Sequence, residues 1–382
     1  MFHSASGKVI DKTIFKQVGQ SVSERALLHD SEGTLDWFSW QMQADLDLWK
    51  IPVSCELGGL GGTWVECAEC LDEVARECED LGFLITSLGH IGSLRLLCDY
   101  GTDEQKQRWV PRLLRGDIAV TAMTEASGGS DLSKMQLAAV KVGSGYRLNG
   151  KKTHITNAPV ATMGLLAGRI PALGVKKDIT LFFMDLDVSG ARIGPAEKNL
   201  GLRTSPTADI EIGNVSIETG NIIGAPGAGL KILHGIISFE RALYGIIAAG
   251  LIDCMTRSAM RRSLSRQAFG RNISHFQYVQ SKLVGMKMSS VICRSLTYEA
   301  LRMLEEKEPD GSSVCSCVKY QAAERLMESA DSLMQIYGHL GYSDPKIGKY
   351  VRDAAGMKIA GGTNDIQKVN IFNQMLSLYT VR

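Results

Sequence analysis

The sequence lacks an excess of charge of either sign: 42 basic residues stand against 41 acidic ones, and the formal net charge is +1. Binding to nucleic acid or to an anionic membrane through the overall field requires a strongly basic balance. We therefore predict neither a nucleic-acid nor a membrane partner. Short basic runs such as Arg261-Arg262 are interpreted as a solvated helix end.

Targeting signals and long apolar runs are also missing. The opening residues, MFHSASGKVIDKT, contain no apolar core of a secretory signal. The most apolar run, 242–251, is too short to span a bilayer. We therefore expect a cytoplasmic protein.

The nine cysteines show no disulfide spacing. Cys67 and Cys70 form one CxxC, but no second pair and no histidine cluster completes a metal site. We predict reduced, mostly buried thiols and no metal. No G-x-G-x-x-G follows a predicted strand, so a Rossmann-type dinucleotide site is not supported either.

What is present changes character twice along the chain. Residues 1–116 show apolar side chains at helical spacing, 117–228 contain short β-rich runs bounded by Gly, Asn and Asp, and 229–382 are helical again. We predict an α+β multidomain protein with an N-terminal all-α domain, a middle β domain and a C-terminal helical bundle. The apolar faces of the last domain predict a homodimer or homotetramer.

Several local signals fix element ends. Thr102 is a plausible N-cap, a helix pair is expected to divide near Gly82, and the dipeptide Asn149-Gly150 is typical of a tight hairpin. Gly270 is expected to close the long helix that begins at residue 229. Asn364 is expected to cap the last helix.

Collinear motifs run along nearly the whole chain: AMTEASGGSDL (122–132), LNGKKTHITNA (148–158), LGLRTSPTADIEIGNVSI (200–217), GAPGAGLKI (224–232), RQAFGRNISHFQ (266–277), QIYGHLGY (335–342) and GGTNDIQ (361–367). Together they resemble the acyl-CoA dehydrogenase family, and the set is specific where each motif alone is weak. The resemblance implies a three-domain fold with a β-barrel-like middle domain and a four-helix bundle.

The resemblance implies FAD, bound between the β domain and the helices. It assigns cofactor contacts to a set of residues spread over the motifs: Met123, Thr124, Ser130, His154, Thr156, Arg266, Phe269, Phe276, Gln335, Gly338, Thr363 and Asp365. Of these, Arg266 and Gln335 would reach the pyrophosphate and ribose of the FAD from a neighbouring subunit. The guanidinium fork of an Arg suits phosphate oxygens. Substrate contacts are assigned to Ser130, Arg241 and Gly362.

The sequence departs from the family pattern at three places. His154 stands where many members have a Trp, Ala268 stands where a hydroxyl-bearing residue is common, and residues 338–342 read GHLGY instead of GGxGY. We expect one cofactor hydrogen bond fewer at position 268.

The base that removes the α-proton is missing from its usual place. Many family members supply it as the Glu of YEGT, whereas this chain has AGGT at 360–363. Glu240 lies instead on an apolar face of the long helix, where an unpaired carboxylate is unfavourable unless it is neutralised, paired or functional. In the isovaleryl-CoA-like branch the base precedes an Arg in this helix, as Glu240 precedes Arg241 here.

We therefore predict Glu240 as the catalytic base and the N–H of Gly361 as a donor to the thioester carbonyl. Read without the family, Glu240 would be a buried Glu that pairs with a Lys or Arg of an adjacent helix. If both positions face the same α-carbon, a Glu restored at Gly361 should recover a little activity in a variant that lacks Glu240.

The expected reaction is FAD-dependent α,β-dehydrogenation of an acyl thioester on coenzyme A or on an acyl-carrier protein. Electrons would pass to an electron-transfer flavoprotein or to oxygen. NGKKTHITNAP and GTNDIQK are similar to members that oxidise aminoacyl groups on carrier proteins in secondary metabolism. Two other hypotheses are a flavin-dependent monooxygenase on the same fold and a non-catalytic scaffold that binds an acyl carrier.

Overall fold

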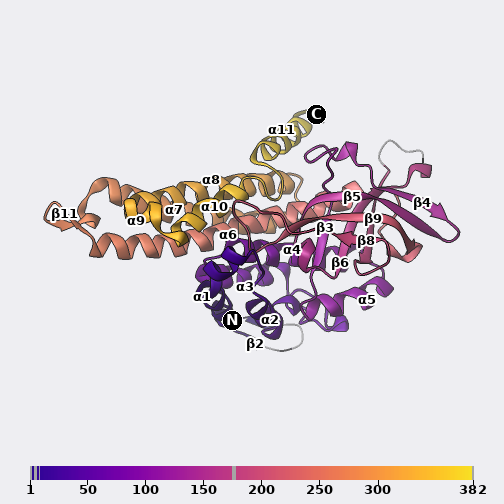
Figure 1. The fold of residues 1–382 in the computed structure, drawn as a ribbon, viewed down its shortest axis with the longest axis horizontal. Helices are drawn as coiled ribbons and strands as arrows, with labels where there is room; N and C mark the ends of the chain where they lie inside the picture. The colour runs from indigo at the N-terminus through magenta and orange to yellow at the C-terminus, as the bar shows by residue number, and fades with distance from the viewer. Residues whose placement is uncertain (1, 4–6, 8, 174–177, 381–382) are drawn as a thin grey trace.

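The computed structural model describes residues 2–3, 7, 9–173 and 178–380 (Figure 1). A helical part, a β part and a second helical part follow one another along the chain, so the predicted fold class is confirmed. The predicted domain boundaries at 116/117 and 228/229 fall between α5 and β3 and between β10 and α6.

The N-terminal part contains five α-helices after a short β1–β2 pair (Phe2–His3, Val9–Ile10): α1 (Lys16–Glu32), α2 (Trp37–Asp45), α3 (Trp64–Glu77), α4 (Leu81–Tyr100) and α5 (Asp103–Leu114). Thr102 caps α5 as predicted, in a capping box with Gln105. The predicted division of this region into two helices near Gly82 is confirmed: α3 ends at Glu77 and α4 begins at Leu81. Gly82 belongs to its first turn, where a β-carbon would lie 2.2 Å from Oγ1 of Thr204.

The middle part is one eight-stranded mixed sheet. Its order is β10-β7-β6-β4-β5-β9-β8, and β3 pairs in parallel with β6. The strands are β3 (Ala119–Ala122), β4 (Ala138–Val142), β5 (Gly145–Thr156), β6 (Met163–Arg169), β7 (Ile179–Asp185), β8 (Ala191–Ile193), β9 (Thr207–Glu218) and β10 (Ile222–Ile223).

The hairpin at Asn149-Gly150 is wrong. The β4–β5 turn lies at 143–144, and Gly150 instead marks a register shift inside β5. A β-carbon at Gly150 would lie 2.7 Å from the backbone of Leu137, so close strand packing explains the glycine.

The C-terminal part consists of α6 (Gly229–Ser265), α7 (Gln277–Glu305), α8 (Gly311–Tyr337), α9 (His339–Ser343), α10 (Pro345–Met357) and α11 (Asn364–Thr380). Figure 1 shows α6, α7 and α8 side by side, and α11 packs against α8. Gly270 does not close α6. The helix ends at Ser265, and Phe269 and Gly270, both with positive φ, form the turn between β11 (Gln267–Ala268) and β12 (Arg271–Asn272).

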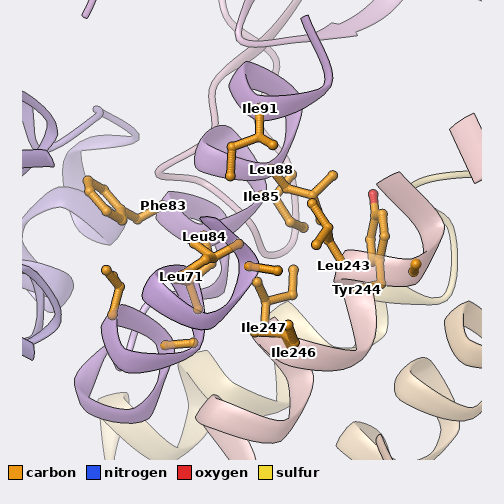
Figure 2. Close-up of a cluster of buried hydrophobic side chains, with 14 of the residues drawn as sticks. Leu71, Phe83, Leu84, Ile85, Leu88, Ile91, Leu243, Tyr244, Ile246 and Ile247 are labelled. Carbon is orange, nitrogen blue, oxygen red and sulfur yellow. The ribbon is translucent and has the colours of Figure 1, made fainter. Parts of the chain in front are cut away.

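Part of the larger hydrophobic core lies where α4 packs against α6. Figure 2 shows Leu84, Ile85, Leu88 and Ile91 of α4 facing Leu243, Tyr244, Ile246 and Ile247 of α6, all of them buried. Aliphatic side chains on both helices make this contact dry. Any polar group that enters it is therefore removed from water.

Two helices of the described residues, α4 and α6, are long and apolar enough to cross a membrane by length and composition alone. The apolar run 242–251 is thus a short part of the longer helix α6. Within each helix 83% of the apolar window is buried inside the protein, which is the situation of a core helix.

All nine cysteines are free thiols. Six are buried, Cys98 and Cys317 are partly exposed, and Cys55 is exposed, in agreement with the prediction of mostly buried thiols. Burial raises the pKa of Cys67 to about 12 and that of Cys98 to about 11. Among the described residues no group of three or more His, Cys, Asp or Glu is placed to hold a metal ion.

Candidate active site

Glu240 lies on α6 against the backbone of α4. A β-carbon at Gly92 of α4 would lie 2.0 Å from Oε1, 2.8 Å from Cδ and 2.9 Å from Cγ of Glu240. The carboxyl therefore rests over a position that has no side chain. As a residue Glu240 keeps some exposed surface, so the carboxyl is not sealed from a substrate.

The surroundings of this carboxyl are apolar, as predicted. Ile236 and Leu243 are buried on the same helix, and the ring of Tyr244 is 5% exposed. Within the described part of the chain, the carboxyl accepts no hydrogen bond and forms no ion pair. Burial raises the pKa of Glu240 to about 8, and the charge of Arg241 lowers it only in part. Such a carboxyl suits proton abstraction near neutral pH.

The side chain of Arg241 binds a backbone carbonyl group and not the carboxyl of Glu240. Its guanidinium is buried, which lowers its pKa, and Nε donates to the carbonyl oxygen of Gly361 at 3.3 Å. No Lys or Arg in the described residues pairs with Glu240. The interpretation of Glu240 as half of a structural ion pair is therefore not supported.

The turn that precedes α11 meets α6 beside the base. Gly361 has φ +68°, and a β-carbon on it would lie 2.9 Å from three atoms of the Tyr244 ring. Buried Gln367 donates to the carbonyl oxygens of Gly362 at 2.9 Å and Gly361 at 3.3 Å. The N–H of Gly361 donates to none of the described residues, which leaves it free to bind an acyl oxygen. Tyr244 lies one helical turn from Glu240, so base and turn are neighbours.

This geometry revises the expectation for a restored Glu at position 361. Any other residue there must adopt a left-handed backbone conformation and must displace the buried Tyr244 ring. We therefore no longer expect a Glu at 361 to recover activity.

Met123 and Thr124 follow β3 and are fixed by β5. Buried Lys152 donates to the carbonyl oxygen of Met123 at 3.1 Å and to the carboxylate of Glu125 at 2.7 Å. Thr153 N–H donates to the carbonyl oxygen of Thr124 at 2.9 Å. Burial lowers the pKa of Lys152, while Glu125 opposes the shift. The predicted residue Ser130 lies further along this loop and is exposed.

The end of β5 carries two predicted cofactor residues. Thr156 is exposed at the last position of the strand. His154 has φ +56° in a second register shift of β5, and its side chain is 69% exposed with Nδ1 2.9 Å from Oε1 of Glu197. Next to Thr156, the buried amide oxygen of Asn157 accepts from Thr86 of α4 at 2.8 Å.

Helix α4 thus joins the strand end to the base. Thr86, which holds the end of β5, and Gly92, which faces Glu240, are six residues apart on α4. At about 1.5 Å per residue this separation is roughly 9 Å along the helix. The end of β5 and Glu240 thus both adjoin α4.

A second group of predicted residues lies elsewhere. A pocket of ≈ 400 Å³ is lined by residues from the far end of α6, from η8 (Ile273–His275) and from the α8–α9 junction, among them Arg262, Arg266, Gln335 and Gly338. The neighbouring β11–β12 turn carries Phe269, which is 95% exposed; its ring lies 5.9 Å from that of Phe276.

Within one chain, this pocket lies far from Glu240. Arg262 follows Glu240 by 22 residues within the continuous helix α6. That corresponds to roughly 33 Å at about 1.5 Å per residue. In Figure 1 the β11 end of the helical part points away from the sheet.

The remaining predicted residues lie at the start of α11. The cap is Thr363, whose Oγ1 accepts from a backbone N–H three residues on, at 3.3 Å. Asn364 is not the cap, because its Oδ1 accepts from buried Lys319 at 2.9 Å. Asp365 is exposed and pairs with Lys368 at 3.1 Å, so its side chain faces solvent.

The chain's residues fit the predicted FAD. Nε of Arg262 is buried without a hydrogen-bond partner among the described residues, and it lines a pocket that also contains Arg266 and the amide of Gln335. Such a donor set suits a pyrophosphate. Thr156, at the end of β5, is exposed. Ala268 supplies no hydroxyl at the pocket end.

Sequence reasoning missed four residues of these sites. Arg262 was interpreted as a solvated helix end, although it lines the pocket and lies over the Tyr337 ring at 5.4 Å. Gly92 and Gln367 carry no local signal in the sequence, and the role of Gly92 depends on contact with a distant helix. For Lys319, a Lys inside an apolar helix pattern is the one clue that the sequence offers.

Comparison with known proteins agrees with this geometry. Three family models match in order: the acyl-CoA dehydrogenase N-terminal domain at residues 7–117, the middle domain at 120–215 and the C-terminal domain at 227–376. The probable acyl-CoA dehydrogenase FadE25 of Mycobacterium tuberculosis is 32% identical over 324 residues, covering 84% of this chain and 82% of that protein.

Two further relatives are similar over most of their length. Mitochondrial isovaleryl-CoA dehydrogenase of Solanum tuberosum is 29% identical over 342 residues, covering 88% of this chain and 82% of that protein. The crystal structure of the prolyl acyl carrier protein oxidase AnaB is 28% identical with a TM-score of 0.90, covering 96% of this chain and 100% of that one. The chain therefore belongs to the acyl-CoA dehydrogenase family, FAD-dependent oxidoreductases that act on the CH–CH group of acyl thioesters.

Proposed function

We propose that this protein dehydrogenates an acyl thioester between its α- and β-carbons and that Glu240 abstracts the α-proton. One observation supports this most strongly: Glu240 is a half-buried acid with no hydrogen-bond partner among the described residues and a pKa of about 8, on the helix that contacts the Gly361 turn through Arg241 and Tyr244. A structural role does not explain an acid kept there without a partner.

Each residue has a distinct task in this proposal. The N–H of Gly361 binds the thioester carbonyl oxygen and stabilises the enolate-like charge that develops on it. Glu240 receives the α-proton on its carboxylate. Arg241 and Gln367 hold the carbonyl groups of the turn, so that its N–H faces the substrate. FAD, when bound, would supply the oxidant for the hydride that leaves the β-carbon.

The carrier of the acyl group is the finer part of the proposal. The relatives include one named for isovaleryl-CoA and one named for a prolyl acyl carrier protein. We propose a short or branched acyl group, or a prolyl-type aminoacyl group, delivered on coenzyme A or on a carrier protein. The electron acceptor would be an electron-transfer flavoprotein or oxygen.

The test is reduction of the bound flavin by substrate. Purified protein is mixed without oxygen with butyryl-CoA, isovaleryl-CoA and prolyl-carrier protein, and bleaching of the flavin absorbance is followed. We expect one thioester to bleach the wild type. Glu240→Gln should bind FAD normally and lose at least about a thousandfold in reduction rate, because an amide at this position cannot accept the proton.

Glu299→Gln is the matched control, since Glu299 is an exposed carboxylate on α7 that pairs only with Arg302. It should behave like the wild type. Normal reduction in Glu240→Gln would rule out Glu240 as the base. Substrate hydroxylation with NAD(P)H and oxygen, unaffected by Glu240→Gln, would favour the monooxygenase. A protein that cannot be loaded with FAD would favour the scaffold.

We also propose that the pocket of Arg262 and Arg266 serves the FAD of a second copy of the chain. Two features support this: the pocket lies roughly 33 Å from the base along α6, and its Arg262 Nε lacks a partner in the described residues. The site would then be complete only in a homodimer or in a larger homo-oligomer.

A further inference from the structure

We propose that Gly92 of α4 is a positioning residue that seats the carboxyl of Glu240 in its reactive orientation. The inference rests on the proposed role of Glu240 as base and names the residue that makes this location of the base possible. It follows from the contact between α4 and α6, which no sequence motif of either helix indicates.

The overlap at Gly92 involves Glu240 alone. The three atoms nearest to a β-carbon at this position are Oε1, Cδ and Cγ of Glu240, all closer than 3.0 Å. Because the overlap extends to Cγ, rotation of the terminal carboxylate does not relieve it. The whole side chain would have to leave its present rotamer.

Other close-packed glycines of this chain have a different environment. Gly250 of α6 lies against the backbone and β-carbon of Ala75, and Gly245 lies against Thr297, Val318 and Cys293. Those glycines let two helices approach each other. At Gly92 the space is filled by an ionisable side chain from the facing helix.

Glycine in a helix interior is unfavourable relative to alanine, so a reason to keep it must lie in the contact. Leu88 and Ile91 of α4 and Leu243 of α6, which are labelled in Figure 2, are buried aliphatic residues of the same contact between the two helices. The space over Gly92 is therefore the place along this contact where a carboxyl fits. An added methyl group would move the carboxyl away from the apolar contact.

Gly89 provides the matched control. It lies one turn before Gly92 on α4, and its β-carbon would meet only Asn157, at 3.9 Å. The test compares Gly92→Ala with Gly89→Ala in the FAD-loaded enzyme, with flavin reduction by substrate measured as a function of pH. Gly89→Ala should keep the wild-type rate and inflection.

Gly92→Ala should bind FAD like the wild type and reduce it roughly tenfold to a hundredfold more slowly, the effect expected for a reactive group displaced by about 1 Å. The inflection of the rate against pH should move to lower pH, because the displaced carboxyl regains water. A merely structural role of Gly92 would change the amount of folded protein and leave the inflection in place.

A double-mutant cycle completes the test. Glu240→Asp shortens the side chain and removes the overlap, so it should cost less in the Gly92→Ala background than in the wild type. Independent effects of the two changes, or a Gly92→Ala enzyme with the wild-type rate and inflection, would overturn the role of Gly92. Normal reduction by Glu240→Gln would instead overturn the base itself, so the two failures are distinguishable.

Discussion

At the scale of single residues, the chemistry depends on how α4 and α6 treat one carboxyl. Glu240 is held among apolar groups without a partner in the described residues, while the nearest cation, Arg241, is turned to the carbonyl of Gly361. Desolvation favours the protonated acid, and this raises its pKa. The carboxylate of Glu240 is a stronger base because of this raised pKa. At neutral pH a larger share of the Glu240 carboxyl groups is protonated.

The pH dependence of flavin reduction follows from this shift. The reactive form is the carboxylate, whose fraction grows as pH rises through the pKa of about 8. We therefore expect the reduction rate at saturating substrate to increase with pH, changing about tenfold per unit below the inflection and levelling off above it. Rapid-mixing kinetics over a pH series measures this. An inflection near the ordinary pKa of a Glu would contradict the buried, unpaired state.

At the scale of elements, the turn between α10 and α11 is held from several sides. Buried Lys319 of α8 donates to Asn364 at 2.9 Å and to the carbonyl oxygen of Lys358 at 3.4 Å, so it contacts both ends of the turn. Burial, helped by the charge of Arg241, lowers the pKa of Lys319 to about 7. The position of the Gly361 N–H therefore depends on a helix that never contacts the substrate in our proposal.

Replacing Lys319 by Met should loosen this turn while filling the same space. We expect a loss of about 1–3 kcal/mol in the free energy of unfolding, because the buried oxygen of Asn364 loses its donor. A lower kcat should accompany it. Lys368→Met is the control, since Lys368 is exposed and pairs with Asp365 on one surface of α11. Thermal unfolding and kcat are compared. Equal behaviour of the two variants would contradict the role of Lys319.

Sequence patterns predict elements where the signal is local. Helical spacing and the Thr102 cap gave α5, because a cap needs only residues within one turn. Gly150 and Asn364 misled for one shared reason: their roles are set by contacts with Leu137 and Lys319. The position of Glu240 could be inferred from its apolar helix face. The space at Gly92 that faces Glu240 could not be inferred, because no sequence pattern in α4 indicates which side chain of α6 packs against it.

At the scale of the whole molecule, α6 carries groups of two different sites. Its first half holds Glu240 and its last turn holds Arg262, roughly 33 Å away. If the pocket of Arg262 and Arg266 serves the FAD of a second copy, every site needs residues from two chains. Two variant chains that are inactive for different reasons should then regain activity when they assemble together.

Complementation tests this arrangement. Glu240→Gln alone should be inactive, and the double variant Arg262→Ala, Arg266→Ala should lose FAD. Co-expression gives mixed oligomers in which one site combines an intact base with an intact pocket, so activity should reappear. We expect roughly a quarter of the wild-type rate if two chains mix at random, since about half of the dimers are mixed and each has one complete site. Activity no higher than the sum of the separate variants would contradict a shared site.

The distribution of thiols described above makes such assemblies easy to follow. Cys55 is the one fully exposed cysteine. Burial raises the pKa of the buried thiols and of the partly exposed Cys98 and Cys317, whereas thiol reagents attack the thiolate. A maleimide dye should therefore attach at a single known place in the unmutated polypeptide. Donor and acceptor dyes on separate batches would report by energy transfer whether subunits exchange, with no cysteine needing removal.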